Sequence, residues 1–346
     1  MTIERKVGMG IAGQPSGDAP DVAEVFSTYL YTGNNGVQNI VNGIDLAGEG
    51  GLVWTKWRGG SGQHELAHTI PSVSYNKQCL NSASNAGEGD SDINNFNSNG
   101  WTTRSYSGQG NGNNRDYASF TFRKKEKFFD VVTYTGNGVA GRTVAHGLNG
   151  SVGMMIVKSN VSAQNWTVYH KSLGATKYTV LNDTAVALTA GVQWNNTAPT
   201  DTNFTVGDDA STNWQGRTYV AYLFADNSSE DADDQMIKCG SFSEASSGNT
   251  TTVNLGWEPQ WVLVKSASDG DNWHMIDSMR GFTANASNNS QELLANDAAG
   301  EGGGTYIRPT STGFIAYPWA GSGGGTITYM AIRAPMMVEP EAATDV

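Results

Sequence analysis

The chain has 346 residues, 43 of them Gly, with 16% charged side chains and a formal net charge of -12. The acidic balance excludes a protein that follows a nucleic-acid backbone, because such binding needs a basic groove that displaces counterions. The 10 Trp, 13 Tyr and 11 Phe exclude a disordered chain, because they supply the apolar surface that makes a core favourable. Abundant Gly, Asn and Thr disfavour helices, so the composition favours strands.

Residues 1–20 contain Gly and Pro, lack the apolar segment of a secretory leader, and are expected to form an N-terminal arm. No apolar run approaches the roughly 18 residues of a membrane span, so no membrane insertion is expected. Cys79 and Cys239 are far apart in the sequence. A disulfide framework is therefore not expected, and the chain should fold in a reducing cytoplasm.

An apolar strand that ends in Lys occurs three times, at residues 51–56 (GLVWTK), 153–158 (GMMIVK) and 261–265 (WVLVK). A later apolar strand that begins with Tyr also occurs three times, at 117–122, 219–224 and 329–332. The lysines are 102 and 107 residues apart, and the tyrosines are 102 and 110 apart. Two anchors with nearly the same spacing indicate a tandem triplication.

Shorter segments follow the same repeat. A first hairpin contains Tyr-Thr-Gly-Asn and then a hydrophobic turn, at 26–44 and at 129–148, with a looser third copy at 237–255 that ends in Val253-Asn-Leu255. After the Lys strand, Trp166 and Trp273 occupy matching places, whereas the first copy has His64 there. The predicted organisation is an arm at 1–20, repeats at 21–127, 128–234 and 235–338, and an acidic tail at 339–346.

Each repeat holds about seven or eight short apolar runs separated by Gly, Asn, Asp, Ser and Pro. This spacing predicts an all-β fold of three tandem antiparallel units, each a sandwich or a barrel of about 100 residues. Whether the sheets form sandwiches or barrels stays open. The short charged linkers at 123–127 and 227–234 suggest exposed crossings between separate cores, and one fused body is the alternative.

The sequence contains no motif that predicts catalysis or a cofactor. His64 and His68 are four residues apart, but the surrounding strand signals argue against a helix, and no third metal ligand has the right spacing. The acidic runs at 88–92 and 230–234 could offer oxygen ligands to Ca²⁺, but they lack the closing Glu of a Ca²⁺ loop and are interpreted as solvated loops. We therefore expect no enzyme, no metal and no cofactor, although a glycosidase carboxylate pair would not be visible in the sequence.

The candidate binding residues are tryptophans. The Gly-rich stretches are typical of hairpin tips, where binding surfaces often lie. Trp57, Trp101, Trp194, Trp214 and Trp319 lie in or beside such loops and could stack on sugar rings or anchor a protein partner. The alternative is that they cover the core.

Several segments together resemble a repeat in structural and tail-appendage proteins of tailed bacteriophages, particularly those of marine bacteria. They are the Tyr-Thr-Gly-Asn turns, the strands ending in Lys, residues 165–178 (NWTVYHKSLGATKY) and residues 219–224 (YVAYLF). The match is strongest over 129–226, plain over 26–58 and partial in the third copy.

The resemblance implies three tandem antiparallel β-sandwich units, lectin-like or jelly-roll-like. It also implies a non-enzymatic virion protein, assembled in the bacterial host cytoplasm, that acts as a tail fibre or appendage. The N-terminal arm would then dock on other virion proteins, and the chain would form a homo-oligomer whose loops bind a host-surface glycan. A capsid decoration protein and a glycan depolymerase stay open as alternatives.

Overall fold

The protein is all-β, as the sequence predicts, with antiparallel strands throughout the part that the structure describes. The computed structural model describes residues 22–70, 77–79, 92–105, 108–284, 290–304, 306–318 and 324–335. Within these ranges the only helical segments are α1 (Val22–Val25) and the 3₁₀ turn η1 (Ser278–Arg280), so no described helix is long and apolar enough to cross a lipid bilayer. The predicted arm, the acidic tail and Trp319 lie outside the described residues.

Unit 1 contains a five-stranded and a three-stranded sheet, with orders β1-β8-β3-β4-β5 and β2-β7-β6. Its strands are β1 (Phe26–Thr32), β2 (Asn39–Val41), β3 (Gly51–Trp57), β4 (Glu65–His68), β5 (Lys77–Cys79), β6 (Ile93–Asn97), β7 (Gly100–Thr103) and β8 (Asp116–Arg123).

Unit 2 has orders β14-β13-β12-β11-β16-β9 and β10-β15. Its strands are β9 (Phe129–Thr135), β10 (Arg142–Ala145), β11 (Val152–Ser159), β12 (Thr167–His170), β13 (Lys177–Val180), β14 (Leu188–Thr189), β15 (Asn203–Val206) and β16 (Thr218–Ala225).

Unit 3 has orders β17-β25-β19-β20-β21-β22 and β18-β24-β23. Its strands are β17 (Ile237–Ser243), β18 (Thr251–Asn254), β19 (Pro259–Ser266), β20 (Trp273–Asp277), β21 (Ser290–Leu294), β22 (Gly302–Gly304), β23 (Ile307–Thr310), β24 (Gly313–Ala316) and β25 (Thr326–Arg333). The large sheets of all three units thus share one strand order: first strand, last strand, Lys strand, and then its successors.

Strand register corrects two details of the predicted repeat. Lys56, Lys158 and Lys265 lie opposite Ala118, Val220 and Thr328, respectively. Ile327 therefore occupies the place of Tyr117 and Tyr219, and the choice of Tyr329 as the third anchor was wrong by two residues. Likewise, Val253 pairs with Phe314 as Val144 pairs with Phe204, so 255–257 (LGW) matches 146–148 (HGL).

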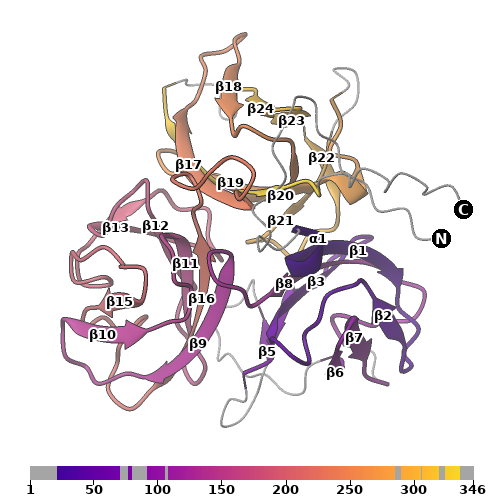
Figure 1. Cartoon of the computed structure of the whole chain (residues 1–346), viewed down its shortest axis with the longest axis horizontal. Helices are drawn as coiled ribbons and strands as arrows, with labels where there is room; N and C mark the ends of the chain where they lie inside the picture. The colour runs from indigo at the N-terminus through magenta and orange to yellow at the C-terminus, as the bar shows by residue number, and fades with distance from the viewer. Residues whose placement is uncertain are drawn as a thin grey trace, which may run out of the picture.

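The three large sheets share one core, and Figure 1 shows them as three lobes around a common centre. Aromatic rings join the units there: the Phe122 ring lies 5.4 Å from Phe224 of unit 2 and 6.0 Å from Trp261 of unit 3. The prediction of separate cores, which was based on the charged linkers, is therefore wrong. Strands such as β16 are apolar on both faces, so their inner faces need a partner in another unit.

The outer faces of the large sheets in units 1 and 3 are covered by the small sheets. In unit 1, Val53 and Ala67 of the large sheet pack with Ile40 and Trp101 of the small sheet. A matching cluster in unit 3 joins β19, β20 and β25 to β18, β23 and β24. The small sheets therefore lie at the outside of the molecule, where their loops are accessible.

Candidate functional site

Two of the five candidate tryptophans are buried. Trp101 and Trp194 are each 1% exposed; Trp101 packs edge-on against Tyr31, and Trp194 packs edge-on against Tyr169. A buried indole cannot stack on a ligand, so these two residues belong to the core, and their selection as binding residues was wrong.

Trp57 is half-buried at the end of β3. The Arg115 guanidinium lies 4.2 Å from the centre of its ring, and Gly60 packs closely on the ring edge. Its own neighbours therefore already occupy part of the surface that a ligand would use.

Trp214 is 51% exposed, in the loop between β15 and β16. Its backbone N–H donates to the Tyr219 hydroxyl at 2.8 Å, and the Arg217 guanidinium lies 5.2 Å from the ring centre. Arg217 in turn donates to Ser162 Oγ at 3.1 Å. Trp214 is thus an exposed aromatic side chain on a backbone held in place by hydrogen bonds.

A buried asparagine organises the loops around Trp214. Asn213 Nδ2 donates to the carbonyls of Gly207, at 2.6 Å, and Val139, at 3.0 Å, and Asn213 Oδ1 accepts from Asn137 N at 2.9 Å. The side chain of Val139 is exposed on one of these loops, and that of Val192 is exposed on a third loop that contacts Gly207. We call Val139, Val192, Trp214 and Arg217 the Trp214 surface.

The same scaffold occurs in unit 1 without the tryptophan. Asn111 Oδ1 accepts from Asn34 N at 3.2 Å, and Gly112 N donates to the Tyr117 hydroxyl at 2.8 Å. The Tyr-Thr-Gly-Asn motif is therefore structural, since it supplies the turn that this asparagine holds. Gly112 stands where unit 2 has Trp214, so the units share the scaffold and differ in the exposed side chain.

The three repeated lysines are fully buried, and their ammonium groups donate hydrogen bonds to backbone carbonyls. Lys56 Nζ donates to the carbonyl of Ala298 in unit 3 at 2.9 Å, and Lys265 Nζ donates to that of Thr184 in unit 2 at 3.1 Å. Lys158 Nζ donates to the Gln164 carbonyl in its own unit. Burial lowers the pKa of Lys56 and Lys265 to about 8. Lys56 and Lys265 therefore link neighbouring units by hydrogen bonds.

A histidine of unit 1 and a tryptophan of unit 3 also link units. His64 Nδ1 accepts from Trp54 Nε1 at 2.8 Å, and Nε2 lies 3.0 Å from the carbonyl of Leu294 in unit 3. At the matching position of unit 3, Trp273 Nε1 donates to the Val180 carbonyl of unit 2 at 2.9 Å. His64 thus replaces a tryptophan while keeping its bond to the next unit.

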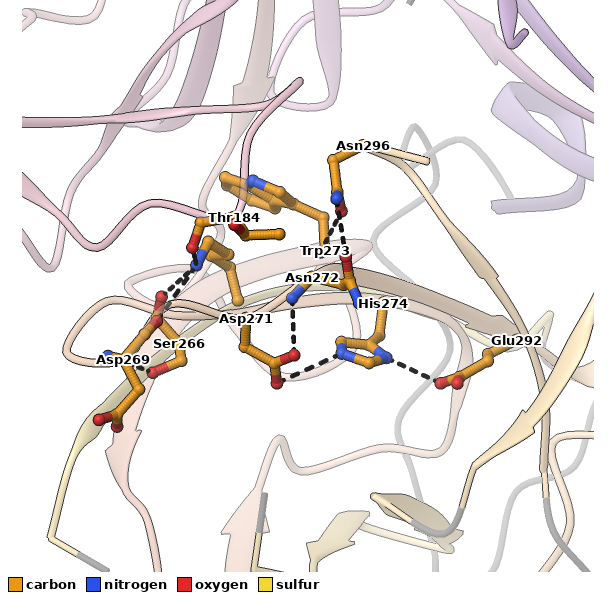
Figure 2. A network of polar contacts seen from close by, with 10 residues as sticks. Thr184, Ser266, Asp269, Asp271, Asn272, Trp273, His274, Glu292 and Asn296 are labelled. Atoms are coloured by element: carbon orange, nitrogen blue, oxygen red, sulfur yellow. Dashed lines mark hydrogen bonds and ion pairs between the residues drawn. The ribbon is translucent and has the colours of Figure 1, made fainter. Parts of the chain in front are cut away.

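His274 is held between two carboxylates, as Figure 2 shows. Its Nδ1 lies 2.8 Å from Glu292 Oε2, and its Nε2 lies 3.5 Å from Asp271 Oδ2. Burial opposes the charged form, but the hydrogen bonds to Asp271 and Glu292 outweigh it and raise the pKa of His274. With both ring nitrogens engaged and the side chain buried, His274 is not placed to transfer a proton to a substrate.

A surface pocket with a volume of about 660 Å³ lies where units 1 and 2 meet, beside the basic linker. Two of the three acids that line it form ion pairs: Glu49 with Arg123 at 3.3 Å, and buried Asp130 with Lys124 at 2.9 Å. The third, Glu126, accepts a hydrogen bond from Asn149 Nδ2 at 2.6 Å. Among the described residues, no three His, Cys, Asp or Glu side chains come together as a metal site.

The fold and these contacts define the structural class of the protein. It is an all-β protein of three structurally equivalent units that share one core. Over residues 21–334 the chain matches a family described as "Domain of unknown function (DUF7483)" and belongs to that family. The match spans all three units. No curated protein matches the chain.

Proposed function

We propose that this protein is a non-enzymatic structural component of a bacteriophage virion, built from three lectin-like β-sandwich units, that presents the Trp214 surface to a host-surface glycan. The single observation that carries the proposal is an exposed Trp on loops that a buried Asn holds together. An aromatic face stacks on the C–H face of a sugar ring, and preorganised loops lose little entropy on binding.

The titratable groups support a role without chemistry. The repeated lysines bind backbone carbonyls, and His64, His170 and His274 are engaged at both ring nitrogens. These lysines and histidines therefore stabilise the fold. A homo-oligomer that docks to other virion proteins through the N-terminal arm would multiply weak glycan contacts.

The first experiment compares the wild-type protein with Trp214→Ala on an array of host-surface polysaccharides. Loss of the ring should weaken binding at least tenfold, because aromatic anchors contribute about 2 kcal/mol or more. Met279→Ala, which shortens another exposed apolar side chain in unit 3, is the matched control and should bind normally. No binding by the wild-type protein, or equal binding by Trp214→Ala, would refute the glycan proposal.

The second experiment locates the protein on the particle with gold-labelled antibody. Label on the tail supports the appendage, label on the head favours capsid decoration instead, and unlabelled particles contradict a virion role. Release of reducing ends from host polysaccharide by the purified protein would favour a depolymerase.

A further inference from the structure

Unit 1 buries a polar cluster that the proposed function does not use. Thr55 of β3, Glu65 of β4 and Asp92, which precedes β6, are all at most 2% exposed. Asp92 N donates to Glu65 Oε1 at 2.8 Å, so the two acidic residues are neighbours. The interpretation of residues 88–92 as a solvated loop is therefore wrong for Asp92.

Two oxygens of this cluster accept no hydrogen bond. Asp92 Oδ2 accepts from Gly110 N at 2.5 Å, but Asp92 Oδ1 is buried without a hydrogen bond, and Asp92 forms no ion pair with a described residue. The hydroxyl of Thr55 lies beside that of Tyr31, which donates its own proton to the Gly110 carbonyl at 2.6 Å. Thr55 can therefore donate to Tyr31, and the lone pairs of Thr55 Oγ1 stay available.

Two glycines lie directly against these oxygens. A Cβ at Gly110 would lie 3.1 Å from Thr55 Oγ1 and 3.2 Å from Glu65 Oε2. A Cβ at Gly108 would lie 2.0 Å from Asp92 Oδ1, so a side chain there would displace the carboxylate. The absence of side chains at both positions lets the 108–110 backbone approach the oxygens of Thr55, Glu65 and Asp92 closely.

The cluster is also electrically negative. It brings two acidic residues, Glu65 and Asp92, side by side in the interior. A buried carboxylate costs several kcal/mol unless a positive charge or a full set of hydrogen bonds compensates it. Asp92 Oδ1 has neither among the described residues.

We propose that Thr55, Glu65 and Asp92 form a Ca²⁺ site. Ca²⁺ accepts six to eight carboxylate, hydroxyl and carbonyl oxygens in irregular geometry at about 2.3–2.6 Å, which suits carboxylate and hydroxyl oxygens that come from two strands and a loop. Mg²⁺ fits less well, because it requires a regular octahedron at shorter distances. A bound Ca²⁺ would compensate the buried charges and join β3, β4 and the 108–110 loop.

Thermal unfolding of the full chain, in CaCl2 and in EGTA, tests the site. Saturating Ca²⁺ should raise Tm by roughly 3–8 °C, the range expected for ligand at about 100 times Kd. Tb³⁺ is a second probe, since Tyr31 should sensitise its luminescence. Asp92→Asn keeps the shape and should lose both effects, whereas Asp116→Asn, which alters a carboxylate at the surface of the same unit, should keep them.

Thr55→Val provides a test that does not depend on Asp92, and it should weaken Ca²⁺ binding at least fivefold while the EGTA form still unfolds cooperatively. The proposal is overturned if Ca²⁺ leaves the wild-type Tm unchanged, if Asp92→Asn responds like the wild type, or if Mg²⁺ gives an equal shift. None of these outcomes depends on glycan binding.

Discussion

Acidification should loosen the contacts that hold the three units together. His64 Nδ1 accepts the Trp54 N–H, so its proton lies on Nε2 and is donated to Leu294 in unit 3. His170 repeats this pattern: Nδ1 accepts from Ser172 N at 3.2 Å, and Nε2 donates to the carbonyl of Tyr329 in unit 3 at 3.1 Å. A second proton on either ring would face another N–H group.

The size of the effect follows from the two pKa values. Burial lowers the pKa of His64 from 6.5 to about 3 and that of His170 to about 4. Below pH 6.5 the unfolded chain therefore binds protons that the folded chain does not, and stability falls with pH. By pH 4.5 each histidine should have cost about 2.5 kcal/mol, because one pKa unit corresponds to about 1.4 kcal/mol.

Urea unfolding between pH 7.5 and 4.5 measures this loss. His64→Gln and His170→Gln keep a side-chain donor but do not titrate, so each variant should lose about 2.5 kcal/mol less than the wild type over this range. Arg142→Gln, which alters a group that stays charged throughout, is the control. If the histidine variants lose as much stability as the wild type, the reasoning is wrong.

Three further changes test the internal contacts. Lys265→Met would leave the Thr184 carbonyl without its charged donor and should lower the free energy of unfolding by about 2–4 kcal/mol. An unchanged urea midpoint would contradict the proposed contribution of this hydrogen bond between units 2 and 3. Because its folded-state pKa is raised, His274 contributes stability that is complete below about pH 6.5 and is lost as pH rises from there through the raised pKa of the folded state, so His274→Asn should flatten this decline in urea titrations. Gly153→Ala would place a Cβ 2.6 Å from Cys239 Sγ, between units 2 and 3, and should lower stability by about 1–3 kcal/mol; a calorimetric Tm equal to that of wild type would count against this close contact.

The sequence by itself determined the all-β class and the three equivalent strand sets. The Lys strands and the Tyr-Thr-Gly-Asn turns are local signals, because runs of apolar residues and turn-forming residues such as Gly and Asn are visible within a short stretch of sequence. Where the local signal weakened, in unit 3, reasoning from sequence placed the anchor at Tyr329 instead of Ile327, since only strand pairing fixes register.

Only the tertiary structure decided which side chains are available. Trp101 and Trp214 both follow a short polar stretch, 97–100 (NSNG) and 208–213 (DDASTN), yet a facing sheet covers Trp101 whereas Trp214 is exposed. Lys56 is an ordinary surface residue by type, but it is buried and bonds to a carbonyl of the adjacent unit, and Asp92 is buried beside Glu65. Burial depends on the segments that pack on the other face of a strand, and those segments come from distant parts of the chain, so no local pattern encodes it.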